Sequence, residues 1–270
     1  MAANFSLIII LAMSDVNLVV DVVWAYVFCQ ICVVIAGCIL LRAYFFDSVV
    51  VDVAPSVPYD KLIVMGIPFF VIALADQGMQ YASQLIVGAL LSPEDVAIFV
   101  ISMRVGVLCS FVLTAINMAY SPHFAKLFSD GDIAGVLVLL KKSIKYSVIL
   151  SAPAIFILLF FPGFVLRIFG ESYVQGQDIL RVIVLGQVVN VITGPVGVLL
   201  SMSGHQRSLM WSGLASALVS VGLTFFLVSK YGILGAAVGT ALGFIFYSLI
   251  ASYVVKVIFG FNVMTVFFRT

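Results

Sequence analysis

The chain has 270 residues, of which 64% are hydrophobic and 9% are charged, and its mean hydropathy is +1.27. A soluble domain usually carries about a quarter charged residues, so this composition excludes a soluble enzyme. The net charge of +1 excludes the basic footprint of a nucleic-acid-binding protein. The composition therefore predicts a polytopic membrane protein.

Long apolar segments predict an all-α transmembrane helix bundle. A bilayer core about 30 Å thick needs about 20 apolar residues per helix. Seven segments reach this length: 18–41, 62–91, 96–120, 146–167, 179–202, 209–229 and 233–257. These runs lack the alternation of barrel strands. Most connections are short, so consecutive helices are expected to be antiparallel neighbours.

The distribution of Lys and Arg predicts the orientation of these segments. Nine basic residues lie in the loops 42–61, 121–145 and 203–208 and in the tail from Lys256, and three lie in the opposite loops, namely Arg167, Arg181 and Lys230. Positively charged loops stay in the cytoplasm, which places the N-terminus outside. The apolar segment 5–13 is about half a span long. We expect it to be the end of a helix that begins before this sequence; the alternative is an ordinary seven-span protein.

Polar residues inside the second and third segments predict a functional site. Asp76 lies halfway along 62–91, with Gln80 and Gln84 at i+4 and i+8 on the same side of the helix. An ionisable group in the hydrocarbon region marks a functional pathway by default. Arg104 lies roughly 12 Å inside the third segment, at the expected depth of Gln80 and Gln84.

We expect Arg104 to line a cavity with Gln80 and Gln84, and Asp76 to act as a counter-charge or proton site. The alternative is a polar clasp that only holds helices together.

Two weaker polar stripes follow on later segments. They are Ser110, Thr114 and Asn117 on the third segment, and Gln187, Asn190 and Gly194 on the fifth. Such stripes serve helix packing more often than substrate binding, and packing is the preferred interpretation here. Gly194-Pro195 predicts a kink in the middle of the fifth segment, since proline cannot continue the hydrogen bonding of a helix.

Small residues predict close packing of the last two segments. Gly235, Gly239 and Gly243 form a GxxxGxxxG ridge, and Ser212, Ser216, Ser220 and Thr224 repeat at every fourth position of the preceding segment. Such ridges let helix backbones approach closely. In the loop 121–145, helical spacing of apolar residues from Ile133 to Ile144 predicts a short amphipathic helix on the inner leaflet, followed by Lys145. Ordinary topology signalling is the other explanation of the lysines.

The sequence offers no pattern for a catalytic site, a metal site or a cofactor. Cys29 and Cys32 form a CxxC motif, but they lie in the middle of a membrane segment, where small apolar filler is the better interpretation. The loop carboxylates Glu171 and Asp178 are expected to be solvated. We therefore expect a protein that is not an enzyme.

Four motifs, in order and at fitting spacing, resemble those of a known family. They are Ser121-Pro122-His123-Phe124 running to Gly131-Asp132, Phe161-Pro162 through Phe169-Gly170-Glu171-Ser172-Tyr173, Leu185-Gly186-Gln187 through Ser203-Gly204-His205, and Tyr231-Gly232 through Gly239-Thr240. The family is the oligosaccharide flippase branch of the multidrug/oligosaccharidyl-lipid/polysaccharide exporter superfamily. One departure is that residues 216–222 lack an asparagine that relatives often carry there.

The resemblance implies two six-helix lobes that face each other. Residues 62–257 would form the C-terminal six-helix lobe, residues 1–61 would be a remnant of the N-terminal lobe (the partial helix 5–13, the span 18–41 and a cytoplasmic linker), and 258–270 would be a cytoplasmic tail. The fold expected is thus one lobe plus about one and a half helices of the other.

The resemblance also implies a function. The protein would translocate an undecaprenyl-diphosphate-linked oligosaccharide across the bacterial cytoplasmic (inner) membrane by alternating access. Arg104 would bind the diphosphate, Gln80, Gln84 and Asn117 would bind sugar hydroxyls, and Asp76 would couple transport to an ion. The partners implied are this lipid-linked substrate, membrane lipids, and an N-terminal lobe or a polysaccharide polymerase. The alternatives are an ion-coupled multidrug exporter and a non-functional fragment; a membrane glycosyltransferase would need a larger outer loop than residues 170–178.

Overall fold

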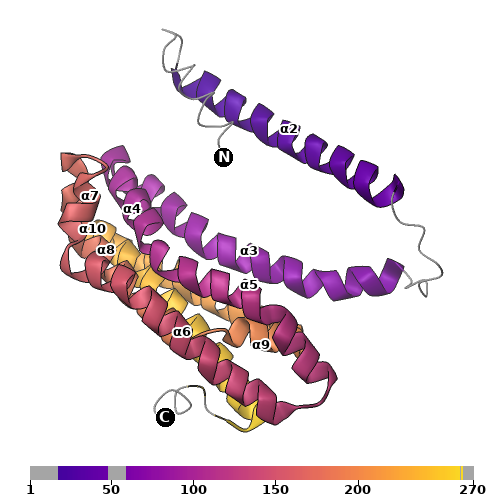
Figure 1. Ribbon diagram of the computed structural model, residues 1–270. Helices are drawn as coiled ribbons and strands as arrows, with labels where there is room; N and C mark the ends of the chain where they lie inside the picture. Colours follow the sequence, from indigo (N-terminus) through magenta and orange to yellow (C-terminus); the bar gives the residue numbers. More distant parts are fainter. Residues whose placement is uncertain (1–17, 48–58, 262, 264–270) are drawn as a thin grey trace. The chain divides into compact units, whose positions relative to one another are not determined.

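The computed structural model describes residues 18–47, 59–261 and 263. Every regular element in this part of the chain is a helix (Figure 1), which confirms the predicted all-α bundle. The chain divides into two compact units, residues 1–58 and residues 59–270. The predicted partial helix 5–13 lies outside the described residues, as do most of the linker 42–61 and the end of the tail. The assignment of the units to two lobes stays a prediction.

The first unit contains one described helix, α2 (Leu18–Asp47). Its 30 residues correspond to a length of roughly 45 Å, enough to cross a bilayer. Apolar side chains such as Trp24, Phe28 and Ile39 are exposed along it, and Cys32 and Cys38 are exposed free thiols. An exposed apolar surface of this kind requires an apolar environment.

The second unit is a bundle of helices of very different lengths. They are α3 (Tyr59–Leu90), α4 (Pro93–Gly106), α5 (Leu108–Ser129), α6 (Ile133–Phe160), α7 (Pro162–Arg167), the 3₁₀ helix η1 (Glu171–Gly176), α8 (Gln177–Thr193), α9 (Val196–Met202) and α10 (Gln206–Phe259). Local chemistry sets several boundaries. Ser92 and Asp95 form a capping box at the start of α4, and Asp132 caps α6; both satisfy backbone N–H groups that a helix start leaves free.

Four stretches of the described chain are long and apolar enough to cross a membrane: 93–129, 133–160, 171–193 and 206–259. The last is bent at Gly232, whose backbone has the non-helical angles φ 60° and ψ −140°, so it holds two of the predicted segments. These four stretches overlap five of the seven predicted spans, but the predicted spans 146–167 and 179–202 extend past the ends of α6 and α8. The other two, 18–41 and 62–91, coincide with α2 and α3, and their crossing of the membrane stays a prediction.

The two halves of α10 pack against each other through the predicted small residues. A Cβ atom on Gly239 would lie 2.5 Å from Thr224 Oγ1, and one on Gly243 would lie 2.4 Å from Ser220 Cβ. The Ser220 hydroxyl donates to the Gly239 carbonyl over 3.5 Å. The glycine ridge therefore fits the serine and threonine ridge of the preceding half, as the sequence predicts.

The predicted loop 121–145 is largely helical. α5 continues to Ser129 and α6 begins at Ile133, so the expected amphipathic segment forms the first turns of a long helix. Val136, Leu140 and Ile144 are buried in an apolar cluster with residues of α5, α9 and α10. The prediction of a separate helix on the inner leaflet was wrong, because the apolar stripe packs against neighbouring helices rather than against lipid.

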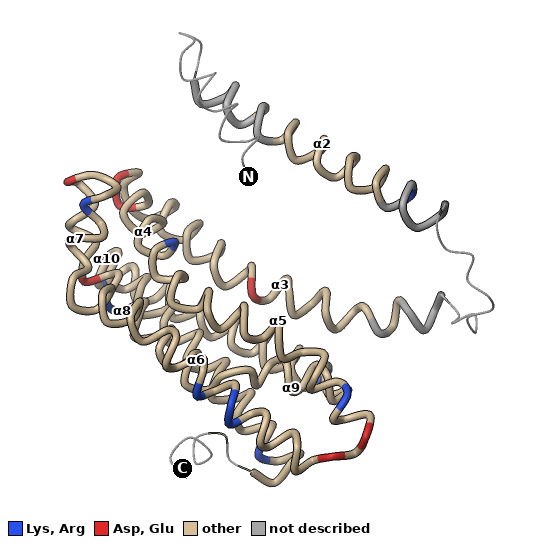
Figure 2. Tube along the Cα trace, in the orientation of Figure 1, with Lys and Arg blue, Asp and Glu red and all other residues tan. Residues whose placement is uncertain are grey.

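Basic residues gather at one end of the second unit. Phe128 of α5 contacts Phe259 of α10, which brings together the helix ends that carry Lys126 and Lys256. The two halves of α10 run antiparallel, so Arg207 in its first turn lies at this same end. Figure 2 shows blue basic positions gathered at the end of the unit where α6 begins. Within residues 121–259, the fold thus groups the basic residues that predict the cytoplasmic side.

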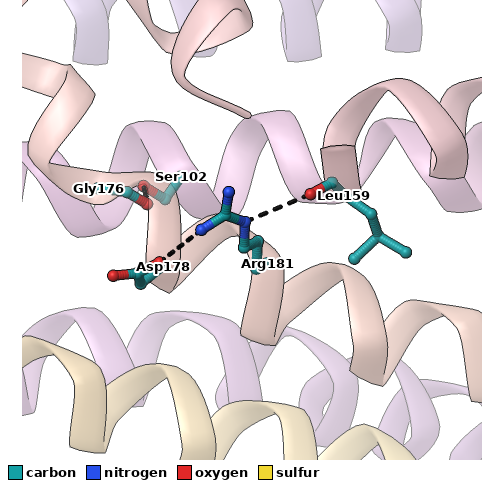
Figure 3. A network of polar contacts seen from close by, with 5 residues as sticks. All are labelled: Ser102, Leu159, Gly176, Asp178 and Arg181. Carbon is teal, nitrogen blue, oxygen red and sulfur yellow. Dashed lines mark hydrogen bonds and ion pairs between the residues drawn. The ribbon is translucent and has the colours of Figure 1, made fainter. Parts of the chain in front are cut away.

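Polar contacts join helices at the opposite end. Arg181 Nη1 lies 2.8 Å from Asp178 Oδ1, and Arg181 Nε donates to the Leu159 carbonyl near the end of α6 over 3.3 Å (Figure 3). Close by, the Ser102 hydroxyl of α4 donates to the Gly176 carbonyl over 3.4 Å. Glu171 pairs with Arg167 at 3.1 Å. Both carboxylates are exposed, as expected for solvated groups, and each is also paired with an arginine.

Candidate functional site: a polar cavity between the helices

A cavity of about 350 Å³ lies inside the second unit, between α3, α5, α9, α10 and the end of α8. It is positioned between two apolar clusters. Met79 and Phe244 belong to the cluster on the side of Gly232, and Val196 and Ala251 belong to the cluster at the basic end; all four line the cavity. The cavity is therefore near the middle of the long helices, where a membrane protein holds its substrate or ion.

Polar side chains from four helices face this cavity. They are Asp76 of α3, Ser110, Thr114 and Asn117 of α5, Asn190 and Thr193 of α8, and Tyr247 and Ser248 of α10. Such groups are costly within an apolar bundle unless they bind one another, water or a ligand. Their convergence makes the cavity the best candidate for a functional site.

Asp76 is the acidic group of the cavity wall. Its side chain is exposed, so the cavity opens to the outside of the bundle beside it. Among the residues that the structure describes, the Asp76 carboxylate has no ion pair and no hydrogen bond. A carboxylate in this position is available to a cation or to a hydrogen-bond donor that enters the cavity.

The two weaker polar stripes of the sequence meet at this cavity. The Ser110 hydroxyl donates to Gln187 Oε1, and Asn190 Nδ2 donates to the same oxygen over 3.4 Å. The first of these bonds links α5 to α8, which agrees with the packing role expected for the stripes, and the second lies within α8. The remaining members, Thr114 and Asn117, line the cavity with Asn190, so the stripes also form part of its wall.

Two buried oxygen atoms in the wall lack a hydrogen-bond partner: Asn117 Oδ1 and Ser248 Oγ. Ser248 as a whole is 3% exposed. Buried polar atoms in proteins are nearly always hydrogen-bonded, and each exception calls for an explanation. A ligand or water in the cavity would supply the missing partners.

The predicted kink forms another part of the wall. α8 ends at Thr193 and α9 begins at Val196, while Gly194 has a φ of 68°. A left-handed backbone of this kind favours glycine, and a Cβ atom at this position would lie 2.6 Å from Ile144 Cγ1. The kink at Gly194-Pro195 is confirmed, and Gly194 itself lines the cavity.

The structure brings only part of the predicted site together. Asp76 and Asn117 line the cavity, whereas Arg104, Gln80 and Gln84 are not among its lining residues. Gln84 lines a separate surface pocket with Tyr81, and Gln80 is half-buried beside it on α3. Their roles in binding stay predictions.

Arg104 lies apart because of the rotation of α4. The neighbouring residues Met103 and Val105 are buried in the bundle, which leaves the Arg104 side chain exposed. Equal depth along two helices therefore did not place this arginine in a cavity with Gln80 and Gln84.

Sequence reasoning missed the contribution of α10. Tyr247 and Ser248 are polar residues inside the apolar run from Ala241 to Ala251, and this signal was available. They were not distinguishable from packing residues, since serine and threonine recur throughout both halves of α10.

A multi-pass helical bundle with a polar cavity near the middle of its helices is the architecture of a membrane transport protein. The model of the MatE family matches residues 68–226, from α3 into the first half of α10, which is more than half of the chain. The chain belongs to the MatE family. It is accordingly a multi-pass membrane protein.

A curated relative gives a further comparison. The chain is 26% identical over 162 residues to a protein of Shigella flexneri named "Putative O-antigen transporter". The match covers 59% of this chain and 38% of that relative, so the chain spans well under half of the relative's length. No solved structure matches the chain.

Proposed function

We propose that the protein takes part in translocating an undecaprenyl-diphosphate-linked oligosaccharide across the bacterial cytoplasmic membrane by alternating access. The observation that carries the proposal is the mid-bundle cavity, whose wall combines Asp76, Asn117 and Ser248. Membership of the MatE family supports transport, and the name of the Shigella flexneri relative supports a glycan as the cargo.

The sugar and the diphosphate of the substrate bind to different groups of residues. Sugar hydroxyls suit the amide and hydroxyl groups of the cavity, including Asn117. The diphosphate needs a cation, and Arg104 on the exposed side of α4 offers a guanidinium that binds phosphate oxygens in pairs. Gln80 and Gln84 are additional hydrogen-bonding groups on α3 for the polar head of the substrate. Asp76 carries the coupling ion.

The proposed partners follow from this mechanism. Alternating access requires a second lobe that faces the first, so we propose an N-terminal lobe as a partner of residues 62–257. Membrane lipids surround the bundle, and a polysaccharide polymerase consumes the translocated units. The match covers only 38% of the relative. We therefore propose, for the chain together with its N-terminal lobe, the activity of a complete transporter.

Export of cationic drugs is the second candidate function. The specific observation in its favour is the Asp76 carboxylate, which lines the cavity and has no basic partner among the described residues. An acidic group inside a membrane-spanning bundle suits an organic cation as well as a coupling ion.

Expression of the chain together with an N-terminal lobe, in a bacterial strain that lacks its own oligosaccharide flippase, tests the first function. We expect surface glycan to be restored. Arg104→Ala should reduce it at least about tenfold, because one lost hydrogen bond to a charged group corresponds to about 1.5–3 kcal/mol. Asn117→Ala should reduce it less, because a bond between neutral groups corresponds to about 0.5–1.5 kcal/mol. Lys230→Gln at the far end of the bundle is the matched control and should keep full export. Unchanged export in Arg104→Ala contradicts the proposed mechanism. Drug resistance without surface glycan would favour the second function.

A further inference from the structure

We propose that the cavity is a subsite for an uncharged or amino-substituted sugar unit and that it excludes acidic sugars. The inference rests on the proposed function and adds to it the class of sugar that enters the cavity. It depends on three properties of the wall: its charge, its unpartnered acceptors and its aromatic surfaces.

The wall of the cavity carries a negative charge. Asp76 is the one ionisable carboxylate among the lining residues, and no lysine, arginine or histidine of the described chain lines the cavity. Arg181, in the same helix as two lining residues, is held by Asp178 and the Leu159 carbonyl at the end of the bundle. Before the coupling ion binds, a sugar carboxylate in this cavity would face the Asp76 carboxylate with no basic side chain beside it, and like charges at short range repel each other.

The unpartnered atoms of the wall require a ligand rich in hydrogen-bond donors. Asn117 Oδ1 and Ser248 Oγ are buried without partners, and the Asp76 oxygens are acceptors when ionised. Sugar hydroxyls, amide N–H groups and ammonium groups donate to such atoms. A sugar carboxylate accepts but does not donate, so it could bind the Ser248 hydroxyl but would leave Asn117 Oδ1 without a partner, in addition to meeting the charge of Asp76.

The shape of the wall suits part of an oligosaccharide. Phe69, Phe244 and Tyr247 contribute aromatic surfaces, against which the apolar face of a sugar ring can pack. The volume of about 350 Å³ is near the lower end of the range for ligand pockets. The cavity therefore accommodates a portion of the glycan rather than the whole lipid-linked unit, and the diphosphate binds outside it.

Cysteine accessibility in the full 270-residue chain tests the proposal. The four native cysteines are replaced by alanine, the chain is reconstituted in lipid nanodiscs, and Thr114→Cys is introduced as a reporter, since Thr114 is an exposed member of the wall. Labelling rates are measured with a cationic and an anionic methanethiosulfonate reagent. Both rates are normalised to those of 2-mercaptoethanol.

We expect the normalised rate for the cationic reagent to exceed that for the anionic one at least about tenfold, as a nearby uncompensated carboxylate implies. Asp76→Asn should reduce the ratio to near one. Equal rates in the parent protein, or an absence of labelling by both reagents, would overturn the proposal.

Protection of the reporter by sugars identifies the class of ligand. Methyl glucoside and glucosamine should slow labelling of Thr114→Cys, and glucuronate at the same concentration should not. Asn117→Ala and Ser248→Ala should abolish protection while the labelling rate without sugar is kept, which shows that the variants remain folded. Protection by glucuronate equal to that by glucosamine refutes the exclusion of acidic sugars. None of these measurements depends on glycan export, so a failure of the proposed function would be seen separately.

Discussion

The Thr240 hydroxyl donates a hydrogen bond to Ser83 Oγ over 3.0 Å, and Ser83 in turn donates to the Met79 carbonyl over 2.9 Å. Both residues are completely buried. This pair connects α3 to the second half of α10, the two elements whose side chains Asp76, Tyr247 and Ser248 form one side of the cavity. The bond therefore fixes the rotation of α3 that turns Asp76 toward the cavity.

Removal of this hydrogen bond is predicted to destabilise the bundle slightly. Thr240→Val and Ser83→Ala should each lower the free energy of unfolding by about 0.6 kcal/mol, the average for interhelical hydrogen bonds in membrane proteins. SDS titration followed by tryptophan fluorescence measures the change. Thr240→Ser, which keeps the hydroxyl, is the control. In the double variant the two losses should not add, and full additivity would show that the two side chains do not interact.

The contact between the two halves of α10 is predicted to be intolerant of a methyl group. In Gly239→Ala the new Cβ would lie 2.5 Å from Thr224 Oγ1 and 2.7 Å from the Thr224 backbone, so the halves must separate. We expect a loss of about 1–3 kcal/mol in the free energy of unfolding, measured by the same titration.

Gly222→Ala is the matched control for this contact. Gly222 lies in the same helix with open space around its Cα, so alanine there should leave stability unchanged or raise it by up to about 1 kcal/mol. Similar losses in both variants would mean that close packing is not the reason for the glycine ridge.

The kink between α8 and α9 is predicted to need glycine for two reasons, which two variants separate. Gly194→Ala combines a left-handed backbone with a contact to Ile144 at 2.6 Å. Gly204→Ala shares the left-handed backbone, with φ 79°, but has no atom within 4 Å. We expect Gly194→Ala to be the more destabilising by about 1 kcal/mol or more, measured as a thermal shift in detergent.

A double variant identifies the clash as the cause. Ile144→Ala removes the Cγ1 atom, so Gly194→Ala should cost less in that background than in the parent protein. An unchanged cost would assign the whole effect to backbone strain.

Arg181, near the start of α8, is predicted to contribute more to stability than its ion pair with Asp178 does. Asp178→Asn removes only the ion pair, in which both side chains are partly exposed, and should cost about 0.2–1 kcal/mol, less at high salt. Arg181→Leu also removes the bond to the Leu159 carbonyl and should cost more. Chemical denaturation at low and high salt measures both variants, with Glu171→Gln as the control for a more exposed pair. Equal costs for Asp178→Asn and Arg181→Leu would show that the bond to Leu159 contributes nothing.

The sequence by itself determined the features that depend on local order along the chain. Apolar runs predicted the helices, and Gly194-Pro195 predicted the kink. A glycine ridge and a serine and threonine ridge, each with a spacing of four residues, predicted that the two halves of α10 pack closely. These features follow from hydrogen bonding and side-chain size within one or two helices, and adjacent helices with short connections have little choice of partner.

Only the tertiary structure decided which polar residues meet. Four helices contribute Asp76, Asn117, Asn190 and Ser248. Successive side chains of a helix are rotated by about 100° around its axis, so a small rotation of the helix moves a side chain to another face. Such a change occurs where α4 meets α5, because the Ser110 amide bonds to Val107 in a three-residue turn. Arg104, before this turn, is exposed, while Ser110, Thr114 and Asn117 after it line the cavity. The sequence predicted how deep each side chain lies along its helix, but the packing of the helices determined toward which neighbour that side chain points.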